Sequence, residues 1–193
     1  MEPCRLTATD LACRRGDRLL FSGLSLDLSA GQACHVTGPN GVGKSSLIRI
    51  LAGLARPYAG KVERQGSLAM LDQLLALDEH PPLAKALGFW QRIDGDALAP
   101  VQTLGLAPLL DVPVRYLSTG QRKRAAIARL IGQQSALWLL DEPLNGLDRE
   151  AVALVERIVA DHCQAGGVAL VASHQPFALP AGATTLHLPD FAA

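Results

Sequence analysis

A single glycine-rich segment, Gly38-Pro39-Asn40-Gly41-Val42-Gly43-Lys44-Ser45, constrains this chain more than any other feature. It follows a short apolar run that ends at Thr37, and beyond it apolar residues recur at helical spacing up to Ala55. The pattern G-x-x-x-x-G-K-[ST] between a strand and a helix is typical of a phosphate-binding P-loop. Its glycines let backbone N–H groups turn inward, and the helix points its positive end at the same place. We therefore expect a bound polyphosphate; a glycine-rich turn that binds nothing is the alternative.

The side chains of this loop have separate expected contacts with a nucleoside triphosphate and its cation. Lys44 is expected to reach the β- and γ-phosphates, and the Ser45 hydroxyl to ligate Mg²⁺. The full set of residues expected to contact ATP here is Gly38, Pro39, Asn40, Gly41, Val42, Gly43, Lys44, Ser45 and Ser46.

A pair of carboxylates follows a short apolar strand later in the chain. The run 137–140 is too short for a helix, and Asp141 and Glu142 come directly after it. Open α/β sheets place their ligands at the carboxyl ends of strands. We expect Asp141 to hold the Mg²⁺ shell and Glu142 to act as the general base that polarises the attacking water. An ordinary solvated loop start is the alternative.

Composition and pattern together predict an α/β fold. Of 193 residues 49% are hydrophobic but only 4% are aromatic, which suits a buried parallel sheet covered by helices. Edge strands joined by hairpins are expected up to about Leu28. Further strands are expected at 34–37, 68–71, 136–140, 168–172 and 184–188, and further helices at about 82–110, up to 132 and at 149–164.

Charge and cysteine spacing exclude several classes of partner. Lys plus Arg and Asp plus Glu number 18 each, so no long-range positive field gathers nucleic acid. The cysteines have no metal-ligand spacing and are expected to be buried thiols in a reducing compartment: Cys4, Cys13, Cys34 and Cys163. The first residues do not resemble an export signal, and no apolar stretch approaches the ~18 residues of a membrane span. We expect a cytoplasmic chain that reaches a membrane only through another protein.

One further motif connects the chain to a known family. Leu117-Ser118-Thr119-Gly120-Gln121, which opens a helix, resembles the L-S-G-G-Q signature of ABC ATPases. The resemblance implies an ABC cassette of the P-loop NTPase (RecA-like) class, with a mostly parallel core sheet, an N-terminal antiparallel β subdomain and a small helical insertion. It also implies a head-to-tail homodimer that holds ATP and Mg²⁺ between one P-loop and the Ser118, Gly120 and Gln121 of the other copy.

Three more residues match family elements in the family's order. Gln73 resembles the Q-loop glutamine, which contacts Mg²⁺ or the lytic water. Asp148 resembles the D-loop aspartate at the cassette interface. His174 resembles the switch histidine, which contacts the γ-phosphate and supports the general base; a lone histidine at a strand end is otherwise usually structural.

The chain also departs from the family pattern. Arg15 stands where many cassettes stack an aromatic ring on adenine, and its guanidinium is expected to stack instead. Thr119 replaces the first signature glycine, which predicts slower turnover or stricter dependence on partners. The basic residues 122–124 are expected to be mainly a solvated helix face, since net neutrality disfavours a nucleic-acid patch. The short interval between P-loop and signature implies a trimmed helical subdomain.

Within the family, phrases such as Leu51-Ala52-Gly53-Leu54-Ala55-Arg56-Pro57 resemble the ATP-binding subunits of cytochrome c maturation systems. That resemblance implies a peripheral subunit on the cytoplasmic side of the inner membrane, docked on integral membrane subunits of the CcmB and CcmC type, whose ATP hydrolysis drives release of the haem-loaded periplasmic chaperone. Docking is expected near 73–90, supported by the apolar Phe89-Trp90 pair, which is equally consistent with helical core. The ATPase of another ABC importer or exporter, and a soluble ABC protein acting on ribosomes or DNA, are the alternatives.

The whole chain, 1–193, is expected to be one ABC ATPase domain. Its nucleotide-binding core is expected to comprise 1–73 and 131–193, and its helical subdomain, which carries the signature, 74–130.

Overall fold

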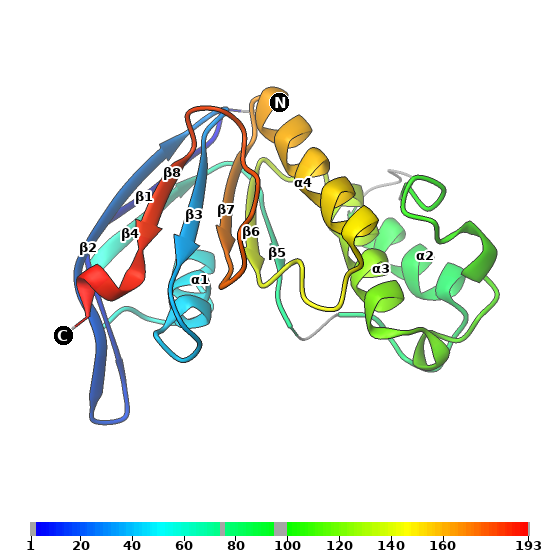
Figure 1. Ribbon diagram of the computed structural model, residues 1–193, viewed down its shortest axis with the longest axis horizontal. Coiled ribbons are helices and arrows are strands. Elements are labelled where there is room, and N and C mark those ends of the chain that lie inside the picture. Colours follow the sequence, from blue (N-terminus) through cyan, green and yellow to red (C-terminus); the bar gives the residue numbers. More distant parts are fainter. Residues whose placement is uncertain (1–2, 74–75, 95–99, 193) are drawn as a thin grey trace.

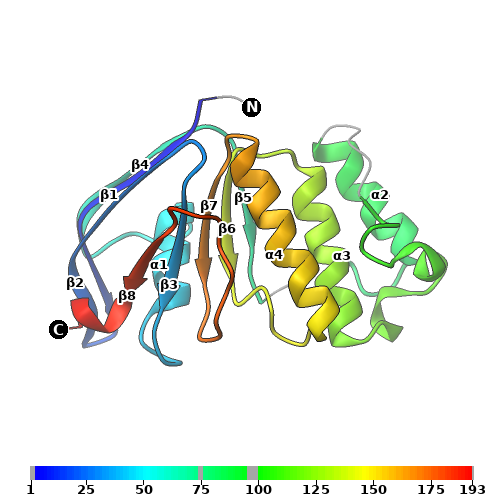
Figure 2. The same ribbon diagram turned by 45° about the horizontal axis from the view of Figure 1, so that its top comes forward.

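The computed structural model describes residues 3–73, 76–94 and 100–192 (Figure 1). Antiparallel strands form one end of the molecule, a parallel sheet its middle and a helical region the other end (Figures 1 and 2).

The central sheet is parallel, with the strand order β5-β6-β7-β3-β8. Its strands are β3 (Ala33–Thr37), β5 (Leu68–Leu71), β6 (Leu137–Asp141), β7 (Val168–Ala172) and β8 (Thr184–His187). Every residue of β6 and β7 is buried, as is usual for central strands that are covered on both faces. The strands lie where the sequence predicts them, and the α/β class is confirmed. Because they are parallel, the carboxyl ends of β3, β6 and β7 share one edge.

A smaller antiparallel sheet has the order β2-β1-β4. It consists of β1 (Arg5–Arg15), β2 (Arg18–Ser29) and β4 (Ala59–Gln65). The predicted N-terminal hairpin is confirmed, but the sequence did not predict β4, which has no apolar alternation and only one residue, Val62, of intermediate burial among exposed ones. β4 is held by pairing with β1, where Gly60 is needed because a Cβ would lie 2.4 Å from the carbonyl oxygens of Thr9 and Asp10.

Helices cover the two faces of the parallel sheet. α1 (Lys44–Ala52) and the antiparallel sheet lie against one face, whereas α3 (Thr119–Gly132) and α4 (Arg149–Gln164) lie against the other, with α2 (Leu83–Asp94) beyond α3 (Figure 2). Strand β6 serves both cores: Leu137 and Leu139 pack in the cluster with α1, and Trp138 and Leu140 in the cluster with α3 and α4.

The helical region differs from its prediction after α2. A helix was expected over 82–110, but α2 ends at Asp94 and the described part from residue 100 onward is made of turns and the short 3₁₀ helix Ala107–Leu109. Pro100 and Gly105, whose φ of 63° is left-handed, interrupt regular helix there. Residues 95–99 lie outside the described ranges. Two more 3₁₀ helices, Val114–Tyr116 and Leu188–Phe191, precede α3 and follow β8. The division at 73/74 and 130/131 stays a prediction.

The four cysteines all lie within the described ranges; all are buried, as predicted, and none forms a disulfide there. Within the described ranges no helix has both the length and the apolar character that crossing a bilayer requires.

Candidate nucleotide-binding site

The glycine-rich segment forms the loop between β3 and α1. Gly41 and Gly43 have φ values of 81° and 117°, which side chains with a Cβ rarely adopt, and Gly43 is the N-cap of α1. The helix begins at Lys44, so the unpaired N–H groups of its first turn face the loop. Loop and helix terminus therefore form the anion-binding geometry that the sequence predicts.

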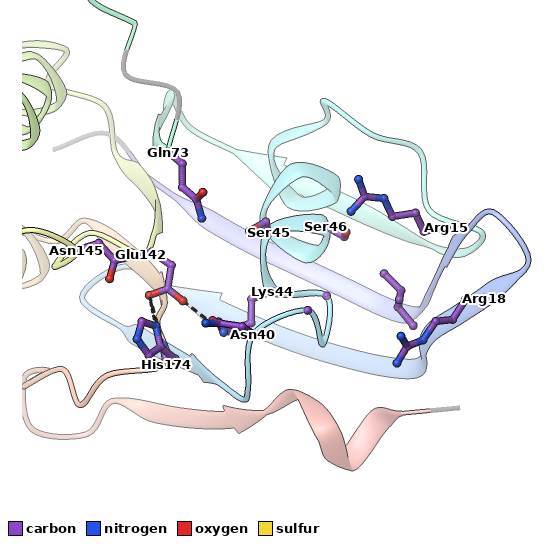
Figure 3. Close-up of a pocket in the computed structure, with 13 residues that line it drawn as sticks. Arg15, Arg18, Asn40, Lys44, Ser45, Ser46, Gln73, Glu142, Asn145 and His174 are labelled. Atoms are coloured by element: carbon purple, nitrogen blue, oxygen red, sulfur yellow. Dashed lines mark hydrogen bonds and ion pairs between the residues drawn. The ribbon is translucent and has the colours of Figure 1, made fainter. Parts of the chain in front are cut away.

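Lys44 folds back over this loop and is buried. Its Nζ donates to the carbonyl oxygens of Gly38 at 2.8 Å and Pro39 at 3.2 Å. It also lies 3.3 Å from Oε1 of Glu142 (Figure 3). A buried ammonium requires such compensation, because removing an unpaired charge from water costs several kcal/mol. The pair brings the cation of the P-loop into contact with the predicted general base.

Glu142 has a backbone conformation that is unusual for its residue type. Its φ is 49°, in the left-handed region, at a cost of roughly 1–2 kcal/mol for a residue with a Cβ. Its N–H donates to the carbonyl of Ala172, at the end of β7, at 2.8 Å. This turn after β6 directs the Glu142 side chain into the site, whereas an extended conformation would continue the strand.

His174 contacts the other oxygen of the Glu142 carboxylate. Its Nδ1 lies 2.9 Å from Oε2 of Glu142, and its backbone N–H lies 3.5 Å from that oxygen. Figure 3 shows both side chains turned toward one another from the ends of β6 and β7. A base whose orientation is fixed by a third group is the usual arrangement for activating water. The structure therefore brings Lys44, Glu142 and His174 together as the sequence predicts.

Asp141 and Ser45 have the chemistry of a Mg²⁺ site. Asp141 is 3% exposed, and within the described ranges its Oδ1 has no hydrogen-bond partner. Burial raises the pKa of this carboxyl, as do the charges of Glu142 and Asp72, against a hydrogen bond from Ser45 and the charge of Lys44. A buried carboxylate oxygen without a donor beside a serine hydroxyl suits a hard cation that takes oxygen ligands and keeps most of its bonds for phosphate and water. These residues fit the cation.

A cavity of about 460 Å³ is lined by Lys44, Ser45, Glu142 and His174 (Figure 3). Asp141 lines a neighbouring cavity of about 470 Å³, which shares Ser45 and Gln73 with the first. Gln73 lines the first cavity near Glu142, and Ser45 and Ser46 line it from α1. Arg15 lines it from β1, although its predicted stacking on adenine stays a prediction. The sequence did not predict three lining residues, Arg18, Leu20 and Asn145. The hairpin offered a signal for Arg18, since a two-residue turn places it directly opposite Arg15.

The signature residues lie outside this cavity. Ser118 caps α3, with its Oγ accepting from the Gln121 N–H at 3.2 Å while Gln121 Oε1 accepts from the Ser118 N–H at 2.8 Å. Gly120 lies so close to the following loop that a Cβ would be 2.7 Å from the carbonyl oxygen of Gly146. Asp148 caps α4 by accepting from the Ala151 N–H at 2.8 Å. The chain thus does not bring Ser118, Gly120, Gln121 or Asp148 to its own P-loop cavity.

The basic run after the signature corrects one expectation. Residues 122–124 were expected to form mainly a solvated face, but Lys123 is only 5% exposed and its Nζ donates to the Glu142 carbonyl at 3.3 Å. Burial lowers its pKa, against the charges of Asp141, Asp72 and Glu142. The helical spacing of Lys123 with the buried Ile127 and Leu130 was the signal that places it on the inner face of α3.

Known proteins resemble this chain over nearly its whole length. The ABC transporter family matches residues 21–145. The cytochrome c biogenesis ATP-binding export protein CcmA of Novosphingobium aromaticivorans is 60% identical, over 93% of this chain and 93% of its own length. CcmA of Zymomonas mobilis is 48% identical, over 98% of this chain and 86% of its own length. Among solved structures, a metal-chelate type ABC transporter in an inward-facing conformation has a TM-score of 0.77 at 28% identity and covers 91% of this chain and 75% of that one.

Proposed function

Because this chain belongs to the ABC transporter family, in the branch of the cytochrome c biogenesis ATP-binding export proteins CcmA, we propose that its ATPase site powers a membrane complex for haem export and cytochrome c biogenesis. Family membership confirms the predicted ABC cassette fold and the predicted ATPase class. In the specific form that we propose, hydrolysis drives release of the haem-loaded periplasmic chaperone. The observation that most directly supports ATP hydrolysis is that the buried Glu142 carboxylate contacts both Lys44 and His174.

The site supports hydrolysis by general-base catalysis. The N–H groups of the P-loop and the Lys44 ammonium bind the β- and γ-phosphates. Ser45, Asp141 and Gln73 would hold Mg²⁺, which would supply positive charge against the phosphate oxygens. His174 fixes Oε2 of Glu142, so this carboxylate is oriented to accept the proton of the attacking water. A general base in such a position contributes about 10²–10⁴-fold to the rate.

Two copies are needed to complete each site. Ser118 and Gly120 stand at the N-terminus of α3, a second anion-binding terminus that lies outside the chain's own P-loop cavity. In a head-to-tail homodimer this terminus of one copy covers the ATP in the P-loop of the other. Asp148, in the adjacent loop, would lie at the same interface.

The groove between the sheet and α2 supports docking of the membrane subunits. Two neighbouring cavities of about 200 and 460 Å³ share Ala76 and Leu77 in their walls. Phe89 is 50% exposed beside them. Trp90 instead has a structural role, because its Nε1 donates to the Ala76 carbonyl at 2.6 Å and its ring lies 3.5 Å from the Arg129 guanidinium carbon. Residues 74–75, within the docking segment predicted over 73–90, lie outside the described ranges.

From this proposal it follows that the chain sits at the cytoplasmic side of the inner membrane and binds integral membrane subunits of the CcmB and CcmC type. Nucleic acid is not expected among its partners. Isolating the chain from native membranes and identifying its companions tests it. Integral membrane subunits of cytochrome c biogenesis are the expected result. Recovery with the membrane subunits of an unrelated importer or exporter, or with ribosomes, would favour those alternatives. Cross-linking from Phe89 should reach the membrane subunit, and a link found only elsewhere would contradict the docking site.

The catalytic assignment has its own test. Glu142→Gln keeps the shape of the side chain but removes the base, so we expect at least a hundredfold loss of turnover with ATP still bound. The retained nucleotide should stabilise the dimer, seen as a shift in molecular mass by light scattering when ATP is added. Brisk hydrolysis by this variant would remove Glu142 from the role of general base.

A further inference from the structure

Lys123 is a buried cation that the chemistry described above does not use. It lies in α3, the helix that begins with the signature, and its side chain enters the protein beneath the loop that follows β6. A buried ammonium costs several kcal/mol unless its neighbours compensate for the loss of water. The contacts that Lys123 makes therefore show what its charge is used for.

The one hydrogen bond of Lys123 that the structure describes goes to the residue proposed as the general base. Its Nζ donates to the main-chain carbonyl of Glu142 at 3.3 Å, and the N–H of Asn145 approaches the same oxygen at 3.4 Å. On the other side of the Glu142 Cα, the N–H donates to Ala172 at 2.8 Å. Both peptide groups of a residue with a φ of 49° are thus held from outside its own segment.

These contacts bear on the direction of the Glu142 side chain. Left-handed backbone is unfavourable for a glutamate and persists only when surrounding contacts impose it. If the carbonyl lost its charged donor, the peptide after Glu142 would be freer to rotate, and the carboxylate would no longer point steadily at His174. A displacement of a catalytic group by about 1 Å is enough to cost roughly a hundredfold in rate.

We propose that Lys123 is a positioning residue, which holds the main-chain carbonyl of Glu142 and through it keeps the carboxylate aligned with His174 and the P-loop. The inference rests on the proposed role of Glu142. The inference links the two ATP sites of the proposed dimer through one chain. Helix α3 presents Ser118 to the ATP bound by the other copy, and its Lys123 orients the general base that acts on the ATP bound by its own chain.

The test compares three substitutions in the full-length chain, isolated with the membrane subunits that accompany it. Lys123→Met removes the donor and keeps the length of the side chain, and we expect kcat to fall by roughly tenfold to a hundredfold while KM for MgATP changes by less than about twofold. Lys123→Arg keeps a charged donor and should retain several times more activity than Lys123→Met. Arg124→Met is the matched control: it removes a neighbouring cation that donates to the Leu104 carbonyl at 3.2 Å and that, in the described part of the chain, makes no hydrogen bond or ion pair with Glu142.

The outcomes separate this inference from the proposed function. Equal losses in Lys123→Met and Lys123→Arg, or a Lys123→Met variant that is no slower than Arg124→Met, would overturn the positioning role. A loss that appears in KM and leaves kcat unchanged would overturn it as well. Glu142→Gln, assayed beside them, tests the base itself, so an active Glu142→Gln variant would show that the proposed mechanism, and not only this link, is wrong.

Discussion

Asp141 is a side chain in which function and stability oppose one another. Burial is the main cause of its raised pKa, so the folded chain disfavours the charged form. A carboxyl whose pKa is higher in the folded than in the unfolded state destabilises the fold above that folded pKa. The penalty disappears as the pH falls below the unfolded value. Asp141 therefore lowers stability at neutral pH in return for an oxygen that can hold a cation.

Asp141→Asn tests both the stability cost of this carboxylate and its role in binding the cation. Without nucleotide and Mg²⁺ we expect a higher melting temperature than that of the unchanged chain at pH 7, and a smaller difference as the pH is lowered. The Mg²⁺ concentration for half-maximal hydrolysis should rise by at least about tenfold, because a ligand charge is lost. The exposed Asp161, substituted by Asn, should change neither quantity. A less stable Asp141→Asn protein would show that the carboxylate is a net stabilising group.

Among the elements, the start of α3 depends on close contact with the loop after β6. A Cβ on Gly120 would lie 2.7 Å from the Gly146 carbonyl oxygen, a main-chain atom that cannot rotate away. We expect Gly120→Ala to lower the free energy of unfolding by about 1–3 kcal/mol, because the two backbones must separate. Gly88 lies in α2, and a Cβ there would have no heavy atom within 4 Å.

Gly88→Ala is therefore the matched control and should raise stability by about 0.5–1 kcal/mol, since alanine favours helix. Urea denaturation measures both changes. A Gly120→Ala variant as stable as Gly88→Ala would mean that the loop yields easily.

Elements that are buried on both faces, or that carry phosphate chemistry, were predictable from the sequence. Strands β6 and β7 are continuous apolar runs, and the P-loop glycines fix a conformation that few other residues allow. Strand β4 was not predictable, because it pairs with β1 through the main chain and its side chains show no apolar alternation. The end of α2 was also misplaced, since 82–110 keeps apolar spacing even where proline and glycine interrupt the helix.

The candidate site was predictable up to the contacts that depend on tertiary packing. Motif order placed Lys44, Glu142 and His174, and in the structure Lys44 and His174 each contact the Glu142 carboxylate. Lys123 was misjudged because a basic run on a helix usually faces solvent, and only packing against the loop after β6 buries it. The partner-dependent roles of Ser118 and Asp148 stay predictions, since each caps a helix within its own chain.

For the whole molecule, the separation of signature and P-loop predicts complementation between two inactive chains. Lys44→Ala disables the P-loop and Ser118→Arg obstructs the signature, so each homodimer should be inactive. A mixed dimer contains one intact composite site, formed by the P-loop of one chain and the signature of the other. Mixing equal amounts should restore about a quarter of the original ATPase activity if the chains pair at random and the sites act independently. Mixed dimers that form but remain inactive would contradict the head-to-tail arrangement.

The stability of the whole chain in mild acid should depend on His162. This buried imidazole is stacked on Trp138 with ring centroids 3.8 Å apart, and burial lowers its pKa. The unfolded chain then binds a proton that the folded chain resists. The free energy of unfolding should therefore fall as the pH drops below the unfolded value near 6.5, with a slope of up to about 1.4 kcal/mol per pH unit.

Urea denaturation between pH 7.5 and 5.5 measures this slope. We expect His162→Phe to flatten it, and His80→Ala, at an exposed histidine, to leave it as it was. His35, whose pKa is also lowered by burial, accounts for a remaining slope. An unchanged slope in His162→Phe would exclude His162 as the source.

The alternation along β6, with successive side chains committed to opposite clusters, has an evolutionary consequence. A substitution in the cluster packed against α3 and α4 does not require a compensating substitution around α1, because the sheet separates the two clusters. A lineage can therefore change apolar side chains in one cluster without having to repack the other.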